Sequence, residues 1–139
     1  MEAIRVQAAL LARGTKLSPP ASQAELRNLA NVGKEETDRY ILNIYSVFDG
    51  FEGRDQKSQI SIWSIDGIFR KIDLNSTIGS DVYVAFGDIL VDSDFIMWCP
   101  SNANLPVYLL YERREIAISV SSFLEKLGAG AFDFVGSGN

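Results

Sequence analysis

The sequence has no histidine among its 139 residues and only one cysteine, Cys99. Histidine is the usual general base near neutral pH and the commonest metal ligand, so Ser-His-Asp and Cys-His catalytic arrangements are excluded. A single cysteine cannot form an intrachain disulfide, and without histidine it cannot build the usual zinc sites. We therefore expect no catalytic residues, no metal and no cofactor, and the composition favours a binding protein over an enzyme.

Long apolar runs are missing as well. No stretch approaches the roughly 18 apolar residues that a membrane span needs, and residues 1–14 lack the apolar core of a signal peptide. Apolar residues make up 47% and charged residues 22% of the chain, which is typical of a globular domain. We expect one soluble, cytoplasmic domain over residues 1–139 that binds no membrane.

Basic residues are scarce in the second half of the chain. Residues 72–139 contain 3 basic and 9 acidic side chains, a net charge of −6, whereas residues 1–71 contain 10 basic and 9 acidic ones. Phosphate contacts need Lys and Arg, so an acidic domain binds nucleic acid poorly, and we expect no nucleic-acid partner. The acidic surplus is either an ordinary solvated surface or a surface that attracts a basic partner.

Helical periodicity and capping residues predict helices in several segments. Ser22 and Glu25 have the spacing of a capping box, in which each side chain accepts a backbone N–H of the other residue. In the first segment, Ile4, Ala8 and Leu11 share one face. The predicted helices cover residues 2–13, 22–33, 35–48, a short segment after Ser64 and a segment from Ser119 to Gly128.

Alternating or β-branched apolar segments predict the strands. They cover residues 59–63, 82–86, 94–99 and 107–111, with a fifth candidate over 115–118. Short loops between them favour antiparallel pairing. The predicted fold class is α+β, a single domain with a mostly antiparallel sheet and helices packed on one side, followed by a Gly-rich tail over residues 128–139.

Three aspartates, Asp88, Asp92 and Asp94, form the densest acidic cluster. A calcium loop needs a different spacing, a following glycine and a distal glutamate, so the pattern disfavours a metal site. A pair of carboxylates could in principle hydrolyse a glycoside, but nothing in the sequence selects two of them as a pair. A carboxylate-based hydrolase or a metal-binding protein is therefore the remote alternative.

Aromatic residues are frequent in the predicted strands. Trp63, Trp98, Tyr83, Tyr108 and Tyr111 all lie in or next to them. Strand aromatics usually belong to the core or form cross-strand pairs. A tryptophan on an exposed face surrounded by acidic residues is instead typical of a protein interface. The sequence alone leaves open which face the helices cover.

Short segments spread over residues 22–127 have a characteristic order. They are the helix of residues 22–29, an aromatic helix end at 45–50, strands at 60–64, 84–88 and 95–98, the segment 106–108 and the closing helix at 122–127. In this order the chain resembles the SUKH superfamily, which includes fungal regulators of cell-wall synthesis and bacterial toxin-immunity proteins. The resemblance implies an α+β fold without a catalytic centre and an activity in protein–protein recognition.

The resemblance suggests a bacterial immunity protein that binds and neutralises a toxin domain of nuclease or deaminase type. Such toxin domains tend to be basic, so an acidic and aromatic surface would attract them. The alternative is a regulatory or scaffold module that binds the cell's own cell-wall or signalling proteins. Either could act as a monomer or a homodimer. The candidate partner-binding residues are Asp49, Glu52, Asp55, Trp63, Asp88, Asp92, Asp94 and Trp98.

Overall fold

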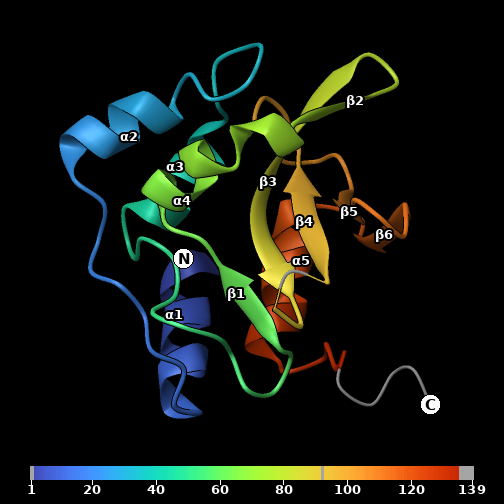
Figure 1. Ribbon diagram of the computed structural model, residues 1–139. Helices are drawn as coiled ribbons and strands as arrows, with labels where there is room; N and C mark the ends of the chain where they lie inside the picture. Colours follow the sequence, from blue (N-terminus) through green and yellow to red (C-terminus); the bar gives the residue numbers. More distant parts are fainter. Residues whose placement is uncertain (1, 92, 135–139) are drawn as a thin grey trace.

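The computed structural model describes residues 2–91 and 93–134, which form an α+β fold (Figure 1). Within these residues, six antiparallel strands form a sheet of order β1-β3-β4-β5-β6, with β2 paired to β3 alone. The elements are α1 (Glu2–Ala12), α2 (Gln23–Leu29), α3 (Arg39–Tyr45), β1 (Ile60–Ile62), α4 (Ile65–Arg70), the 3-10 helix η1 (Ile72–Leu74), β2 (Ser76–Ile78), β3 (Asp81–Ile89), β4 (Asp94–Trp98), β5 (Val107–Leu109), β6 (Arg114–Ala117) and α5 (Val120–Gly128).

The predicted α+β class is confirmed, and local signals placed most elements correctly. In the capping box, the Ser22 hydroxyl accepts from the Glu25 N–H at 3.1 Å, and the Glu25 carboxylate accepts from the Ser22 N–H at 2.9 Å. Helix α3 is shorter than predicted, because the Asp38 carboxylate accepts from the Tyr40 N–H and caps the helix there. Strand β2 was missed, since Ser76–Ile78 is short and polar.

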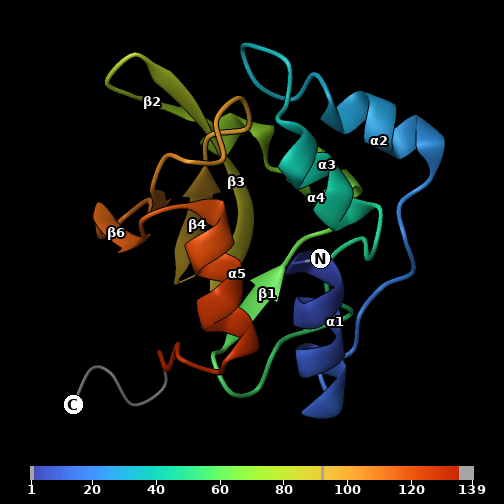
Figure 2. The same ribbon diagram turned by 180° about the vertical axis from the view of Figure 1, so that it is seen from behind.

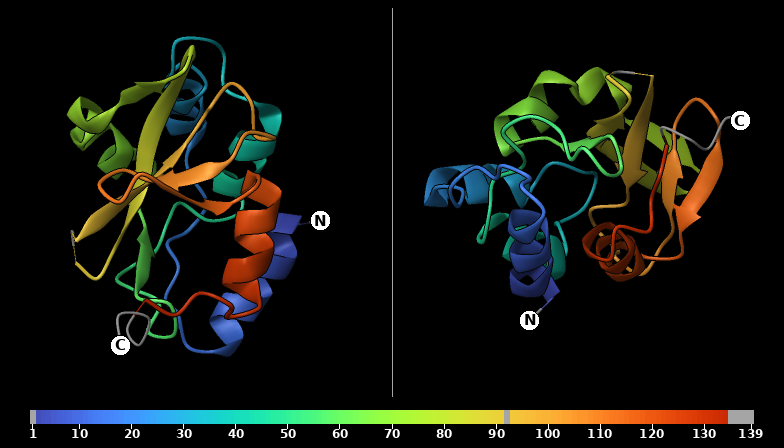
Figure 3. Two further views of the ribbon diagram at one scale, coloured as in Figure 1. Left: turned by 90° about the vertical axis from the view of Figure 1, so that its right-hand side faces the viewer. Right: turned by 90° about the horizontal axis from the view of Figure 1, so that it is seen from below.

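The apolar face that Ile4, Ala8 and Leu11 form in α1 is exposed. Ile4 and Leu11 are 54% and 53% exposed, whereas Ala3, Val6 and Leu10 are buried. Both stripes have helical spacing, so periodicity could not choose between them. The buried stripe packs against α5, where the Gly128 backbone approaches Val6, and Figures 2 and 3 show the two helices side by side.

Two apolar clusters lie on opposite sides of the sheet. All five α-helices of the described chain contribute to the larger cluster, together with Val84, Phe86, Ile96 and Trp98 from the sheet. The smaller cluster on the other side contains no residue from an α-helix. We call this second side the helix-free face because it lacks α-helices, although Leu74 of the 3-10 helix η1 packs against it. Its buried residues are Tyr83, Ala85, Phe95, Met97 and Cys99.

The predicted Gly-rich tail begins inside α5, which extends to Gly128. The next residues fold back onto the body, since Phe132 is buried with its ring 5.4 Å from that of Phe123. Residues 135–139 lie outside the described part of the chain.

The turn between β3 and β4 has an unusual backbone. Leu90 and Val91 have φ angles of 49° and 55°, in the left-handed region that β-branched residues rarely adopt. Because asparagine tolerates this region, we expect Val91→Asn to raise the free energy of unfolding by about 1 kcal/mol. Ile118→Asn is the matched control, because Ile118 and Val91 are 70% and 71% exposed but only Val91 has a positive φ. Equal changes in the free energy of unfolding for Val91→Asn and Ile118→Asn, measured in urea, would contradict backbone strain at Val91.

Candidate partner-binding surface

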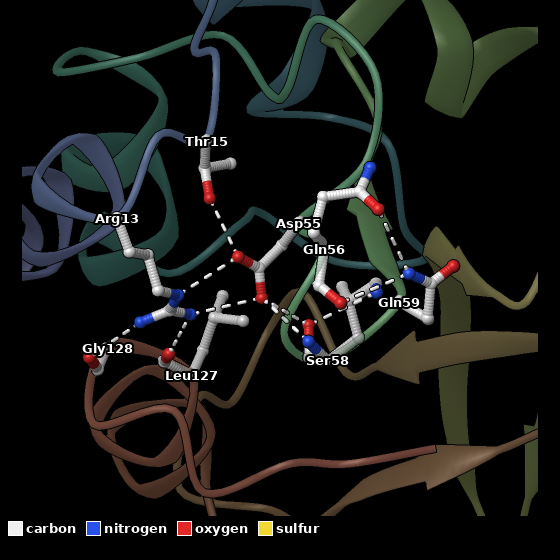
Figure 4. Close-up of polar contacts among 9 residues, drawn as sticks. Arg13, Thr15, Asp55, Gln56, Ser58, Gln59, Leu127 and Gly128 are labelled. Carbon is white, nitrogen blue, oxygen red and sulfur yellow. Dashed lines mark hydrogen bonds and ion pairs between the residues drawn. The ribbon is translucent and has the colours of Figure 1, made fainter. Parts of the chain in front are cut away.

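Asp55, predicted to bind a partner, is a buried structural residue that is only 1% exposed (Figure 4). The Arg13 guanidinium donates two hydrogen bonds to the two Asp55 oxygens, at 3.0 and 3.1 Å, and also donates to the last carbonyls of α5. The hydroxyls of Thr15 and Ser58 donate to the same carboxylate at 2.7 and 2.6 Å. Asp55 therefore joins α1, the loop before β1 and α5, and it is not available to a partner.

Burial alone would raise the pKa of Asp55. The hydrogen bonds from Arg13, Ser58 and Thr15 outweigh this effect and lower the pKa from 3.8 to about 2. The carboxylate is therefore charged at neutral pH and stabilises the fold in that form.

Asp88 and Trp63 are brought together on the helix-free face. The Trp63 indole N–H donates to Asp88 Oδ2 at 3.2 Å, while Arg54 forms an ion pair with Oδ1 at 2.6 Å. Asp88 is buried and its charge is matched by Arg54, so it is not the free acidic contact that we expected. Trp63 is half-buried, and the rings of Trp63 and Phe95 pack edge to face with their centroids 5.8 Å apart.

Asp94 and Trp98 are also interior. The Asp94 carboxylate accepts from the backbone N–H groups of Phe95, Tyr111 and Glu112, which holds the turn between β5 and β6 against β4. The Trp98 side chain is 1% exposed on the helical side of the sheet, so it cannot anchor a partner there. For Trp98 the sequence left the covered face open, because alternation along a strand does not say which face the helices cover.

The remaining candidates are dispersed. Asp49 is half-buried and accepts from the Ile65 N–H at 2.8 Å, and burial raises the pKa of its carboxyl. Glu52 is exposed. Asp92 lies outside the described residues. The predicted set therefore does not form one acidic surface.

The helix-free face instead carries two groups of aromatic rings. Trp63, Phe95 and Tyr111 lie in a row with centroid distances of 5.8 and 5.5 Å. Tyr83 and Tyr108 form an edge-to-face pair at 5.4 Å. Tyr111 is 62% exposed, so the row ends at the molecular surface. The sequence marked these tyrosines as strand aromatics, but we did not include them among the candidate partner-binding residues. The apolar strand pattern over residues 107–111 was the signal that could have identified Tyr108 and Tyr111.

Acidic residues flank the Tyr83–Tyr108 pair. Glu115 lies opposite Tyr108 in the β5–β6 register, so both side chains are on the same face. Burial raises the pKa of Tyr83 to about 12, and the neighbouring Tyr108, Asp81 and Glu115 add to this effect. Asp81 and Glu115, which are outside the predicted set, are thus the acidic residues that act on Tyr83.

No family model matches the chain, and no curated protein matches it. Within the described residues, no three His, Cys, Asp or Glu side chains gather as a metal site would require. No helix in this part of the chain has the length and apolar character needed to cross a bilayer.

Proposed function

We propose that the protein is a non-enzymatic protein-binding domain that uses the helix-free face. In this proposal it is an immunity protein that neutralises a basic toxin domain of nuclease or deaminase type. The observation that carries the proposal is the set of aromatic rings on the helix-free face, to which no α-helix of the described chain contributes. Phe95 and Tyr83 are buried, Trp63 and Tyr108 are partly exposed, and the row ends at the exposed ring of Tyr111. The resemblance to the SUKH superfamily supports the same class of activity.

The aromatic and acidic residues have different parts in this proposal. Tyrosine and tryptophan supply most of the binding energy in many interfaces, because large rings bury much area at little entropic cost. Glu115 and Asp81 lie beside these rings, and the second half of the chain has a net charge of −6. Acidic groups at the rim would accelerate the approach of a basic partner more than they would strengthen the final complex.

The contribution of acidic residues to association is tested by replacing one of them with lysine. With the captured partner, Glu115→Lys should lower the association rate roughly fivefold at low salt and have little effect at high salt, because salt screens exposed charges. Glu125→Lys is the matched control: Glu125 is also exposed, but it lies on α5 in the helical layer. Equal effects of the two substitutions on the association rate would show that Glu115 makes no local contribution to the attraction of the partner.

The partner itself is found by capture from the native cell. The tagged protein is used at low and at high salt, and the retained proteins are identified by mass spectrometry. A basic, multidomain, toxin-like protein retained at high salt would support the immunity function. Recovery of the cell's own wall or signalling proteins alone would favour the regulatory or scaffold alternative. Turnover of glycan substrates by the purified protein would contradict both binding functions.

A further inference from the structure

A groove of about 470 Å³ lies on the helix-free face between β2 and the end of β5. Ser76, Thr77 and Ile78 of β2 line it on one side, and Tyr108, Leu110 and Arg113 are among the residues on the other. Five of its eight lining residues are apolar or aromatic. This volume and this lining, mainly apolar with a few polar groups, are typical of ligand-binding sites in proteins.

One wall of the groove is a strand with an unpaired edge. In the described sheet β2 pairs only with β3, in the register Ser76–Tyr83, Thr77–Val82 and Ile78–Asp81. In an antiparallel pair, successive residues direct their backbone N–H and C=O groups to opposite edges. Part of the β2 backbone therefore faces away from β3, and an extended peptide could add there as a further strand.

The other wall offers an apolar contact and a positive charge. Tyr108 and Leu110 pack against the buried cluster of the helix-free face and stay partly exposed. Arg113 is exposed, and within the described residues it has no ion-pair partner, whereas its neighbour Arg114 pairs with Glu112 at 2.9 Å. Arg113 also has a φ of 55°, in the left-handed region. A guanidinium binds carboxylate and phosphate groups, and of these a carboxylate is what the side chains of an unmodified peptide supply.

We propose that this groove binds an extended peptide segment of the partner protein that carries a carboxylate among apolar residues. The segment would add to the free edge of β2, place an apolar side chain on Tyr108 and Leu110, and direct a carboxylate to Arg113. The inference rests on the proposed function in taking the occupant to be a protein. It adds a binding mode in which a strand supplies affinity and side chains supply selectivity. A partner with a net positive charge fits this mode, because Glu115 and Asp81 lie opposite the groove residues Tyr108 and Ile78 and attract positive charge, whereas Arg113 binds the single carboxylate of the segment.

The test uses random octapeptides displayed on phage and selected on the full-length protein. Enriched sequences should contain Asp or Glu in alternation with apolar residues, because alternate residues of a strand face the same side. Synthetic versions should bind Arg113→Asn about tenfold more weakly than the wild type, as expected for the loss of a hydrogen bond to a charged group. Asparagine tolerates the left-handed backbone at this position, so the fold should be retained.

Arg114→Asn is the matched control, because it removes the same charge one residue away, outside the groove lining. Peptide binding should be unchanged in this variant, and thermal unfolding should show that both variants are folded. No enrichment, enrichment without acidic residues, or equal losses in the two variants would overturn the proposal. If the peptide-binding test fails while Glu115→Lys still lowers the association rate of the captured partner, only the inference about the groove is wrong. If peptides bind through Arg113 but capture recovers no protein partner, the proposed function falls instead.

Discussion

Asp55→Ala is expected to lower the free energy of unfolding by about 3 kcal/mol. The substitution removes the buried carboxylate that accepts hydrogen bonds from Arg13, Thr15 and Ser58. The Thr15 and Ser58 hydroxyls would lose their buried acceptor, and Arg13 would keep its charge without a partner. Arg13 retains 24% of its side-chain exposure, which limits the loss to the lower end of the range for broken buried pairs. Urea unfolding measures the change.

The same carboxylate should make the protein sensitive to acid. Its pKa is lowered from 3.8 in the unfolded chain to about 2 in the fold, so its contribution is fully present above pH 4. That contribution, about 2 kcal/mol, is lost as the pH falls through about 2, because protonation removes the charged acceptor. In Asp55→Asn the unfolding free energy should vary less between pH 4 and pH 2 than in the wild type.

Asp66→Asn is the control for both measurements. Asp66 pairs with Arg70 on the surface of α4, where the carboxylate is 64% exposed, so the loss should stay within about 0.5 kcal/mol. If Asp66→Asn destabilises as much as Asp55→Ala, or if Asp55→Asn keeps the wild-type pH profile, Asp55 does not have the structural role assigned to it.

Gly50→Ala should be comparably severe, at about 3 kcal/mol. Gly50 has a φ of 79°, and a Cβ there would lie 2.5 Å from the Trp63 carbonyl carbon and 2.6 Å from the Ser64 nitrogen. Both contacts are with backbone, which cannot move aside as a flexible side chain does. The substitution would displace the start of α4 and the Trp63 ring on the helix-free face, so it should also weaken capture of the partner.

Gly53→Ala separates backbone strain from collision. Gly53 has a φ of 114°, but a Cβ there meets no atom within 4 Å. We therefore expect only the conformational cost, about 1 kcal/mol, in thermal or urea unfolding. Similar losses of unfolding free energy for Gly50→Ala and Gly53→Ala would show that collision of the added Cβ with the backbone of Trp63 and Ser64 is not what destabilises Gly50→Ala.

The elements that sequence analysis predicted correctly depend on neighbouring residues. The Ser22–Glu25 capping box spans four residues, and strands such as β4 are marked by a short apolar run between polar turns. Such signals are complete within one segment, so the sequence contains what is needed to recognise them.

The candidate site was predicted poorly because its residues depend on distant partners. Asp55 and Arg13 are 42 positions apart, and the Trp63 indole meets Asp88 across 25 positions. No local pattern distinguishes these carboxylates from exposed ones such as Glu115. Similarly, Trp98 and Tyr108 both lie in apolar strands, and only the placement of the helices makes one interior and leaves the other partly exposed.

Hydrogen–deuterium exchange of the protein alone and in complex with its captured partner tests the central claim most directly. The account predicts slower exchange in β2 (Ser76–Ile78) and in the turn over residues 110–113 when the partner is bound, because both border the helix-free face. Exchange in α1 (Glu2–Ala12) should be unchanged, since this helix lies in the opposite layer. Slower exchange confined to α1 and α2 (Gln23–Leu29) would place the interface on the helical side and contradict the account.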